Sequence, residues 1–341
     1  MKQLLSEFRH FNVLQEDDLS WMTAIAHPKT YQPGMFLMQE GQPIQSMYLA
    51  LSGHLSVLES LPNGSKGNLL TLTAGELLGE TSLLSNQSSS MTIEAVEPAE
   101  VLELSKQQLE QKLESDRDFA ARFYRLLAIK LSERLRQLSN LMAKRQIKEG
   151  EPLRKVLMVF ATLNDSDVAW MLANGRSEKA PLGAALIEQN KSVPAVYLLL
   201  EGMLGIYINT GDPDQPHETE VARRVKGDIL GDMSFVDGGL ASATVRALEN
   251  TWVLALPQST LAAKLQEDGG FASRFYRAIA QTLSNRCQDL LMRGGLSTIS
   301  MDAINLLSQD IEVEDEINLD VLEGTAIAAT RFDWLIQQLR R

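Results

Sequence analysis

The sequence predicts a mainly β protein with helices (α+β), built from two tandem antiparallel β-rolls that each end in a long C-terminal helix. Three observations predict this class: the chain length, an internal repeat, and many short apolar segments bounded by turn-forming residues. A length of 341 residues suits about two domains. With 44% hydrophobic and 22% charged residues, the chain has the composition of a globular protein with sizeable cores.

The repeat is visible from the first helix onward. Trp21-Met22 recurs as Trp170-Met171, 149 residues later. The segment RFYR that begins at Arg122 recurs at Arg274, 152 residues later. The three extra residues of the second copy fall between Gly202 and Gly227, where the sequence NTGDPDQPHETE is dense in turn formers. A longer hairpin loop would hold this insertion at little cost, so we interpret the chain as a duplication.

Both copies have the same order of predicted elements. A short helix around residues 17–26 or 165–173 comes first, and strand–turn–strand segments such as MYLALSGHLSVLE and VYLLLEGMLGIYI follow. Short strands at regular spacing are typical of an antiparallel sandwich or roll. A long amphipathic helix closes each copy, from 106 to 138 in the first, and the Phe-Tyr pairs at Phe123 and Phe275 are expected to anchor the cores.

The predicted domain limits follow from the repeat. Domain 1 covers residues 1–142, a basic and polar linker covers 143–155, domain 2 covers 156–292, and an acidic tail covers 293–341. We interpret this linker as a solvated connection rather than as a binding patch. The end of the tail, TRFDWLIQQLRR, has the pattern of a short amphipathic helix.

Charge, cysteine content and hydropathy argue against several classes of protein. Lys and Arg number 32 against 44 Asp and Glu, and a net charge of −12 argues against nucleic-acid binding. Cys287 is the single cysteine, so no intramolecular disulfide is expected, and its apolar helix face favours packing. No apolar run approaches the ~18–20 residues of a membrane span, and no signal peptide is recognised. A cytoplasmic protein without a membrane span is expected.

Catalytic and metal-binding motifs are scarce. The four histidines have no ligand spacing with one another or with Cys287, which argues against a zinc site. The motifs GxxxxGK[ST], GxSxG and HExxH do not occur. We therefore expect neither an enzyme nor a bound metal.

One segment in each copy has the parts of a ligand pocket. Residues 75–95 and 227–247 share the pattern Gly-acid-x-x-Gly-acid, then a short helix, a turn and a strand with Thr. Glycines let a backbone approach a ligand closely, helix N–H groups bind anions, and a carboxylate accepts from a sugar hydroxyl. Together these parts suit a sugar phosphate. The candidate ligand-binding residues are Gly75, Gly79, Glu80, Ser89, Ser90 and Thr92 in the first copy, and Gly227, Gly231, Asp232, Ser242 and Thr244 in the second.

Both segments resemble the phosphate-binding cassette of the cyclic-nucleotide-binding domain, and the resemblance covers roughly residues 1–140 and 150–292. It implies a leading helix, an eight-stranded β-roll and a long closing helix in each copy. It also implies that Glu80 and Asp232 accept from a ribose 2′-hydroxyl. The family places a phosphate-gripping arginine nine residues further on, but Ser89 and Ala241 stand there.

Losing such a charge-assisted contact costs about 2–3 kcal/mol, or roughly 30- to 150-fold in affinity. Two interpretations of the cassettes stay open: retained architecture of the roll, or a pocket that holds a cyclic nucleotide weakly. Arg223 and Arg224 lie just upstream of the second cassette, and we expect them at the surface rather than in the pocket.

The function predicted is that of a non-catalytic regulatory or scaffold protein, with cyclic-nucleotide binding weakened or lost. It would act through a protein partner or self-association, using the long helices and the C-terminal tail. The alternative is a ligand-gated regulator that binds cAMP, cGMP or a related nucleotide in one or both rolls. The tail has no basic recognition helix of the helix-turn-helix kind, so DNA binding is not expected.

Overall fold

The computed structural model describes residues 2–60, 66–85, 87–145, 158–210, 217–293 and 319–340. These residues form two compact units. Unit 1 contains residues up to 131 together with 284–293, and unit 2 contains 132–283 together with 319–340, each within the described ranges. The predicted linker lies mostly outside the described residues, and the predicted domain limits stay predictions.

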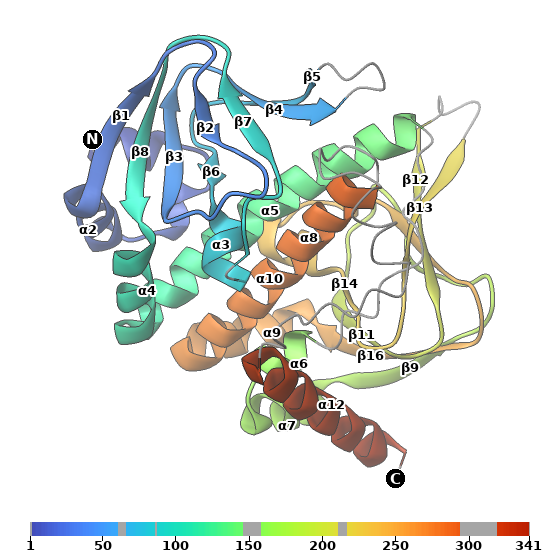
Figure 1. Ribbon diagram of the computed structural model, residues 1–341. Helices are drawn as coiled ribbons and strands as arrows, with labels where there is room; N and C mark the ends of the chain where they lie inside the picture. Colours follow the sequence, from blue (N-terminus) through green and yellow to red (C-terminus); the bar gives the residue numbers. More distant parts are fainter. Residues whose placement is uncertain are drawn as a thin grey trace. The chain divides into compact units, whose positions relative to one another are not determined.

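Unit 1 contains a roll of two four-stranded antiparallel sheets (Figure 1), which we call roll 1. Its strands are β1 (Ala26–Tyr31), β2 (Phe36–Met38), β3 (Ser46–Ser52), β4 (Leu55–Ser60), β5 (Lys66–Leu72), β6 (Leu77–Leu78), β7 (Thr92–Ala95) and β8 (Ala99–Ser105). The first sheet has the order β1-β8-β3-β6 and the second has the order β2-β7-β4-β5.

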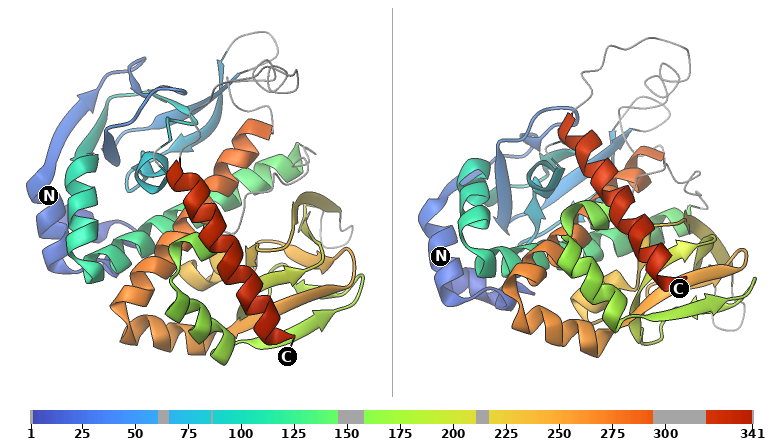
Figure 2. Two further views of the ribbon diagram at one scale, coloured as in Figure 1. Left: turned by 60° about the horizontal axis from the view of Figure 1, so that its bottom comes forward. Right: turned by 90° about the horizontal axis from the view of Figure 1, so that it is seen from below.

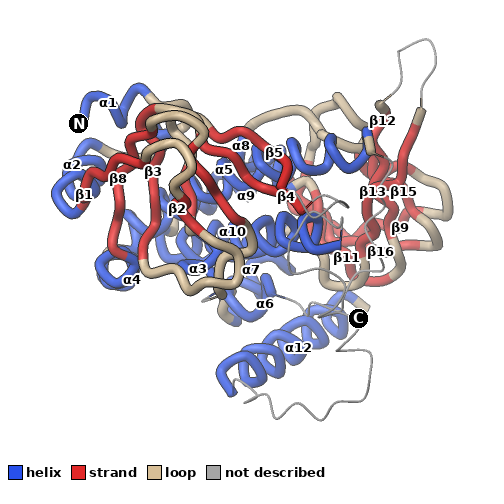
Figure 3. Tube along the Cα trace, turned by 45° about the horizontal axis from the view of Figure 1, so that its top comes forward, coloured by secondary structure: helices blue, strands red, loops and turns tan. Residues whose placement is uncertain are grey.

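Unit 2 repeats this arrangement as roll 2, and Figure 3 shows the strands of both rolls in red. Its strands are β9 (Arg176–Ala180), β10 (Ala185–Ile187), β11 (Ala195–Glu201), β12 (Leu204–Asn209), β13 (Glu218–Arg224), β14 (Ile229–Leu230), β15 (Thr244–Ala247) and β16 (Thr251–Pro257). The sheet orders are β14-β11-β16-β9 and β10-β15-β12-β13. The predicted fold class is confirmed. The connection between β12 and β13 is longer than that between β4 and β5, as the insertion predicts.

Short helices precede each roll. They are α1 (Lys2–Glu7), the 3-10 helix η1 (Phe11–Val13) and α2 (Glu16–Ile25) in unit 1, and α6 (Met158–Thr162) and α7 (Asp165–Asn174) in unit 2. The predicted leading helices are therefore confirmed as α2 and α7. A capping box starts each of these two helices. A carboxylate oxygen of Asp18 accepts a hydrogen bond from the backbone N–H of Gln15 at 2.7 Å, and one of Asp167 accepts from the backbone N–H of Asn164 at 2.9 Å.

Each copy has the predicted long closing helix, but the single helix predicted from 106 to 138 in the first copy is wrong, because it is interrupted at Asp116. The chain instead forms α4 (Lys106–Ser115) and α5 (Arg117–Lys144) in the first copy, and α9 (Gln258–Glu267) and α10 (Gly269–Arg293) in the second. Asp116 adopts an extended conformation between α4 and α5, and its Oδ1 accepts from the Phe119 amide at 2.9 Å. Asp268 does the same for Phe271 at 2.8 Å. An aspartate that caps a following helix competes with helix continuation, and apolar periodicity alone does not reveal it.

An aromatic cluster and an ion pair hold each leading helix to its closing helix. In unit 1 the ring of Trp21 meets Phe119 edge-on, with centroids 5.2 Å apart, and Phe119 stacks on Phe123. In unit 2, Trp170 packs on Phe271 in a tilted arrangement, with centroids 5.3 Å apart. Phe119, Phe123, Phe271 and Phe275 are fully buried, which confirms the predicted core role of the Phe-Tyr pairs. Cys287 is buried too, as predicted.

The ion pair is bidentate in both units. Arg122 donates from Nε to Asp18 Oδ2 at 2.6 Å and from Nη2 to Oδ1 at 2.8 Å. Arg274 makes the same two bonds to Asp167. Both carboxylates are nearly fully buried, with side chains 5% and 4% exposed. A guanidinium fork satisfies both oxygens of a carboxylate at once, so each pair fixes one helix against another in a single geometry.

The helix predicted at the C-terminal end is longer than expected. It is α12 (Leu319–Leu339), and it lies along α6 and α7 within unit 2 (Figure 2). Arg331 donates to Asp165 Oδ1 at 2.6 Å and to the carbonyl oxygens of Phe160 and Leu163 at 3.0 and 2.5 Å. Phe332 packs edge-on against Phe160. Arg331 thus satisfies carbonyl groups that the end of α6 leaves without a helical partner.

The bidentate pair predicts a position-specific loss of stability in unit 1. Asp18→Asn removes the charge that Arg122 requires and weakens the capping box. We expect the free energy of unfolding to fall by about 3 kcal/mol, as for other broken buried pairs. Urea unfolding of the full chain measures this loss.

Asp17→Asn is the matched control, because Asp17 is the exposed neighbour on the same helix. We expect this variant to stay within about 0.5 kcal/mol of the wild type. Equal unfolding midpoints for the two variants would contradict the role assigned to the pair.

Candidate functional site

The four cassette glycines adopt backbone conformations that side chains disfavour. Gly75, Gly79, Gly227 and Gly231 have φ of +87°, +84°, +92° and +75°. A Cβ on Gly79 would lie 2.7 Å from the carbonyl oxygen of Ser46, and one on Gly231 would lie 2.7 Å from that of Ala195. The second glycine of each cassette therefore lets the chain pass directly over the strand beneath it. This requirement belongs to the roll itself and exists without any ligand.

The cassette acids lie in the protein interior. Glu80 begins the short helix α3 (Glu80–Ser85), and Asp232 begins α8 (Asp232–Asp237). Their residues are only 4% and 3% exposed, and both make polar interactions within the chain. The two copies thus place their acids in equivalent and equally buried positions.

The two positions where the resemblance expects arginine lie in buried turns. Ser89 is 4% exposed, and its hydroxyl donates to the carbonyl oxygen of Met91 at 2.7 Å. Its backbone N–H donates to the Gln42 carbonyl at 3.0 Å, and its own carbonyl accepts from the Gly41 N–H at 2.8 Å. Ser89 is therefore committed to holding its turn against the loop between β2 and β3.

The second copy closes its turn with the same backbone bonds. Ala241 is 4% exposed, its N–H donates to the Lys191 carbonyl, and its carbonyl accepts from the Asn190 N–H, both at 2.9 Å. Thr244 Oγ1 accepts a hydrogen bond from the backbone N–H of Gln189 at 3.1 Å. In the first copy, Thr92 Oγ1 accepts one from the backbone N–H of Glu40 at 3.2 Å. The predicted threonines therefore connect the cassette to the facing loop. Ser90 and Ser242 are half-buried.

The two arginines upstream of the second cassette make surface contacts, as predicted. Arg223 is exposed on β13, and its Nε donates to Glu220 Oε1 at 2.5 Å. Arg224 Nη1 donates to the Arg223 carbonyl at 2.8 Å. Neither described contact directs a guanidinium toward the cassette.

A pocket that the sequence analysis missed opens on the inner face of roll 1. It has a volume of about 510 Å³, and Gly34–Gln39, Gln42–Ser46, Tyr48 and Glu103 line it. None of the predicted cassette residues is among these lining residues. Glu103 is the one charged residue in this lining, and it is a carboxylate rather than the cation that a phosphate would require.

Lys29 and Ser46 hold Glu103 in place. Lys29 Nζ lies 2.5 Å from Glu103 Oε2, and Ser46 hydrogen-bonds to the same carboxylate. Burial favours the neutral acid, but the bonds from Lys29 and Ser46 outweigh it and lower the pKa of Glu103 below its ordinary value. The hydrogen bond to Glu103 raises the pKa of Lys29. Burial, and next the charge of Glu103, raise the pKa of Tyr48. At neutral pH the pocket wall therefore carries an ionised Lys–Glu pair beside a neutral tyrosine.

Within the described ranges, no three His, Cys, Asp or Glu side chains gather as metal ligands would. No helix in the same ranges is both long and apolar enough to cross a bilayer.

Because Gly231 passes close to the strand beneath it, we expect an alanine there to destabilise the fold more than an alanine at an unobstructed glycine. Gly231→Ala places a methyl group against the Ala195 carbonyl and forces a left-handed alanine. Gly183→Ala forces the same backbone conformation, at φ +84°, but its Cβ would meet no atom within 4 Å. We expect Gly183→Ala to cost about 1–2 kcal/mol and Gly231→Ala at least about 1 kcal/mol more. Urea unfolding of both variants measures the difference, and equal losses would disprove the close-approach argument.

We expect Glu103 to contribute to the loss of folding stability as pH falls. Because its pKa in the folded protein lies below the ordinary value of 4.5, its stabilisation is complete above that value and is lost as pH falls through the lower folded pKa. We expect Glu103→Gln to make the free energy of unfolding fall less steeply than in the wild type between about pH 5 and pH 3. Urea unfolding at each pH tests this. Glu100→Gln, exposed on the opposite face of β8, should keep the wild-type slope.

Comparison with known proteins agrees with this architecture. The model of the family described as "Cyclic nucleotide-binding domain" matches residues 28–116 and 177–268, which together exceed half of the chain. The cAMP-activated global transcriptional regulator CRP of Pasteurella multocida (strain Pm70) is 28% identical over 124 residues, or 36% of this chain and 59% of that protein. Glutaminase 1 of Bradyrhizobium diazoefficiens is 34% identical over 122 residues, or 36% of this chain and 19% of that protein.

The chain thus spans less than two thirds of the length of either curated relative. Among solved structures, the regulatory domain of Toxoplasma gondii PKA with cAMP is similar at 20% identity and a TM-score of 0.29. That match covers 78% of this chain and 95% of the other. Because the family model matches one stretch in each roll, the chain belongs to the cyclic nucleotide-binding domain family and carries two such domains in tandem.

Proposed function

We propose that this protein is a non-catalytic regulator that acts through protein contacts, and that its cassettes have weakened or lost cyclic-nucleotide binding. The observation that carries the proposal is the pair of buried turns at Ser89 and Ala241. A cyclic phosphate needs a cation at this place, and the backbone of each turn is instead bonded to the facing loop. The glycines and acids of the cassettes then serve the architecture of the rolls.

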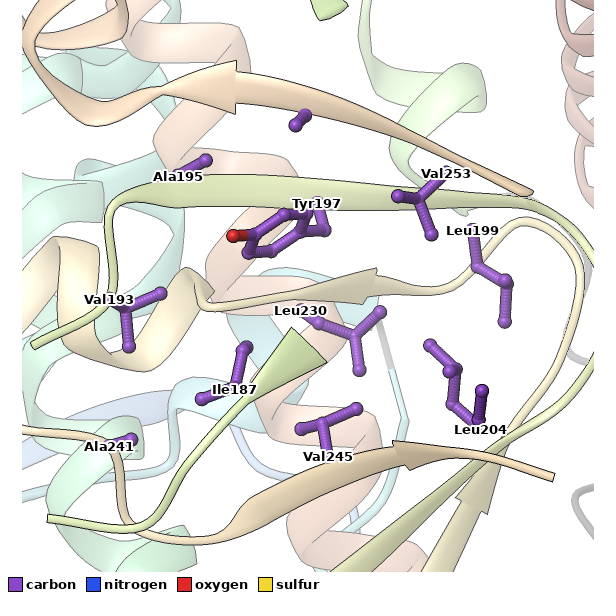
Figure 4. Packing of buried hydrophobic residues seen from close by; sticks show 12 residues of the cluster. Ile187, Val193, Ala195, Tyr197, Leu199, Leu204, Leu230, Ala241, Val245 and Val253 are labelled. Atoms are coloured by element: carbon purple, nitrogen blue, oxygen red, sulfur yellow. The ribbon is translucent and has the colours of Figure 1, made fainter. Parts of the chain in front are cut away.

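Two further features support weak or absent nucleotide binding. The inner face of roll 2 is filled by twelve buried residues, nearly all aliphatic (Figure 4). The pocket of roll 1 presents Glu103, and because Lys29 neutralises this carboxylate, the pair offers a phosphate group no net positive charge. Among the described residues of this cluster and this lining, none therefore supplies the uncompensated positive charge that the family's usual ligand requires.

A protein contact is supported by the surface of α12. Ile327 and Trp334 lie two turns apart on this helix and are 47% and 40% exposed. Large apolar side chains exposed on one face of a helix are available to a partner. The rest of the helix is anchored to unit 2 by Arg331 and Phe332, so these side chains are presented on a fixed element.

The alternative function, a regulator gated by a ligand in a roll, is favoured by one observation. The pocket of about 510 Å³ in roll 1 has the size of a small-molecule site. This alternative applies to roll 1 alone, because the equivalent residues of roll 2 are packed together.

Calorimetric titration of the full chain with cAMP, and separately with cGMP, tests the proposal. We expect no saturable heat below about 50 μM for either ligand, because the missing arginine contact is worth about 2–3 kcal/mol. Saturable binding below that concentration would overturn the proposal. Glu80→Ala and Asp232→Ala would then show which roll binds, because each removes the expected ribose contact from one cassette.

A further inference from the structure

Helix α12 has one face that no described part of unit 2 covers. Ile327, Thr330, Trp334 and Gln337 are all exposed. They follow one another at intervals of three, four and three residues, so they form a single line along the helix, which we call the α12 seam. This spacing is the pattern by which one helix packs lengthwise against another.

A groove runs beside the α12 seam, between α12 and α7, and its volume is about 500 Å³. Val168 and Ala169 line it from α7, and Trp334 lines it from α12. Arg331 and Asp165 also line it, and because they are bonded to each other they give the groove no net charge. The groove therefore suits an apolar side chain of a protein better than a charged molecule.

The charges of α12 change sign from one end of the helix to the other. Asp320 and Glu323 lie in its first two turns, and Arg340 and Arg341 follow its last residue. Arg340 pairs with Glu201 at 3.2 Å, but both side chains are 61% exposed, and an exposed pair contributes little. The 21 residues of the helix span about 30 Å, several times the Debye length of about 8 Å. The two ends therefore do not neutralise each other within one chain.

These features fit a second copy of α12 that runs in the opposite direction. In an antiparallel pair the acidic end of each helix meets the basic end of the other, whereas a parallel pair places like charges together. The shape of the seam agrees, because Thr330 is small and Trp334, one turn further on, is large. A two-fold axis between them places Trp334 of each copy over Thr330 of the other, at the groove beside Ala169.

We propose that the protein forms a homodimer through antiparallel contact of two α12 seams, with Trp334 of each copy in the groove between α7 and α12 of the other. The inference rests on the proposed function and deepens it, because it makes a second copy the partner of the exposed surface of α12. Arg331 and Phe332 fix α12 to unit 2, so each copy offers the seam and the groove on one rigid support.

Sedimentation velocity of the full chain, from about 1 to 100 μM, tests the proposal. We expect a species with twice the mass of one chain at the higher concentrations. Trp334→Glu removes the indole that enters the groove and should raise the dissociation constant of the dimer at least about tenfold. Thr330→Arg keeps both large apolar side chains but blocks the place of the other copy's indole, so it should weaken the dimer as well. Because both positions are exposed, circular dichroism should show wild-type folding.

Leu182→Glu is the matched control. Leu182 is an apolar side chain of unit 2 that is 69% exposed and lies outside α12, so the same kind of substitution there should leave the dissociation constant unchanged.

Disulfide crosslinking tests the direction of the two helices, because the natural Cys287 is buried. The proposed pairing places residue 327 of one copy opposite residue 337 of the other. Ile327→Cys chains mixed with Gln337→Cys chains should therefore form a mixed disulfide under mild oxidation. Neither variant should crosslink alone, because its two cysteines would lie about 15 Å apart along the helices.

Three results would overturn the inference: a chain that stays monomeric up to about 100 μM, a dimer that Trp334→Glu or Thr330→Arg leaves intact, or crosslinking of Ile327→Cys chains alone. Each of these leaves the proposed function standing. Saturable binding of cAMP below about 50 μM would instead overturn the proposed function, and it would not alter the sedimentation result that supports the dimer.

Discussion

The bidentate pair between an aspartate of the leading helix and an arginine of the closing helix sets the frame of each unit. Asp18 with Arg122, and Asp167 with Arg274, fix two helices that are about a hundred residues apart in sequence. The first sheet of each roll packs its other face toward helices of this frame, so its inner face is left to meet the second sheet. What fills that inner space is then decided by a few strand residues. The frame is the same in both copies, and the interior is not.

That separation explains how two copies of one fold can have different interiors. The turns at Ser89 and Ala241, the threonine bonds to the facing loop and the left-handed glycines recur in both rolls. They close the cassette without reference to a ligand. The residues that differ, such as Glu103 against Ala255, lie on strands whose backbone is already fixed. Such positions can exchange apolar packing for polar chemistry with little effect on the rest of the roll.

The sequence alone predicted the duplication, the class of fold and the place of the insertion, because these rest on repeated motifs and on turn-forming residues. It missed the break at Asp116, since a capping aspartate within an apolar-periodic stretch looks like a surface residue of one helix. It also missed the pocket of roll 1. Finding it requires knowing which face of β8 points inward, and the alternation of Glu100, Val101, Leu102 and Glu103 does not reveal that when both faces of a strand are mostly covered. The one indication of the pocket in the sequence was Glu103, which stands where the second copy has Ala255.

The contact of Arg331 with the end of α6 has a consequence for the order in which unit 2 is completed. The carbonyl oxygen of Phe160 accepts a hydrogen bond from Arg331, which lies 171 residues further along the chain. During synthesis all strands of roll 2 are translated before that donor, so α6 and α7 gain this partner only after the strands have been made. The last helix of unit 2 to be translated, α12, therefore packs on α6 and α7, which are translated before the whole of roll 2.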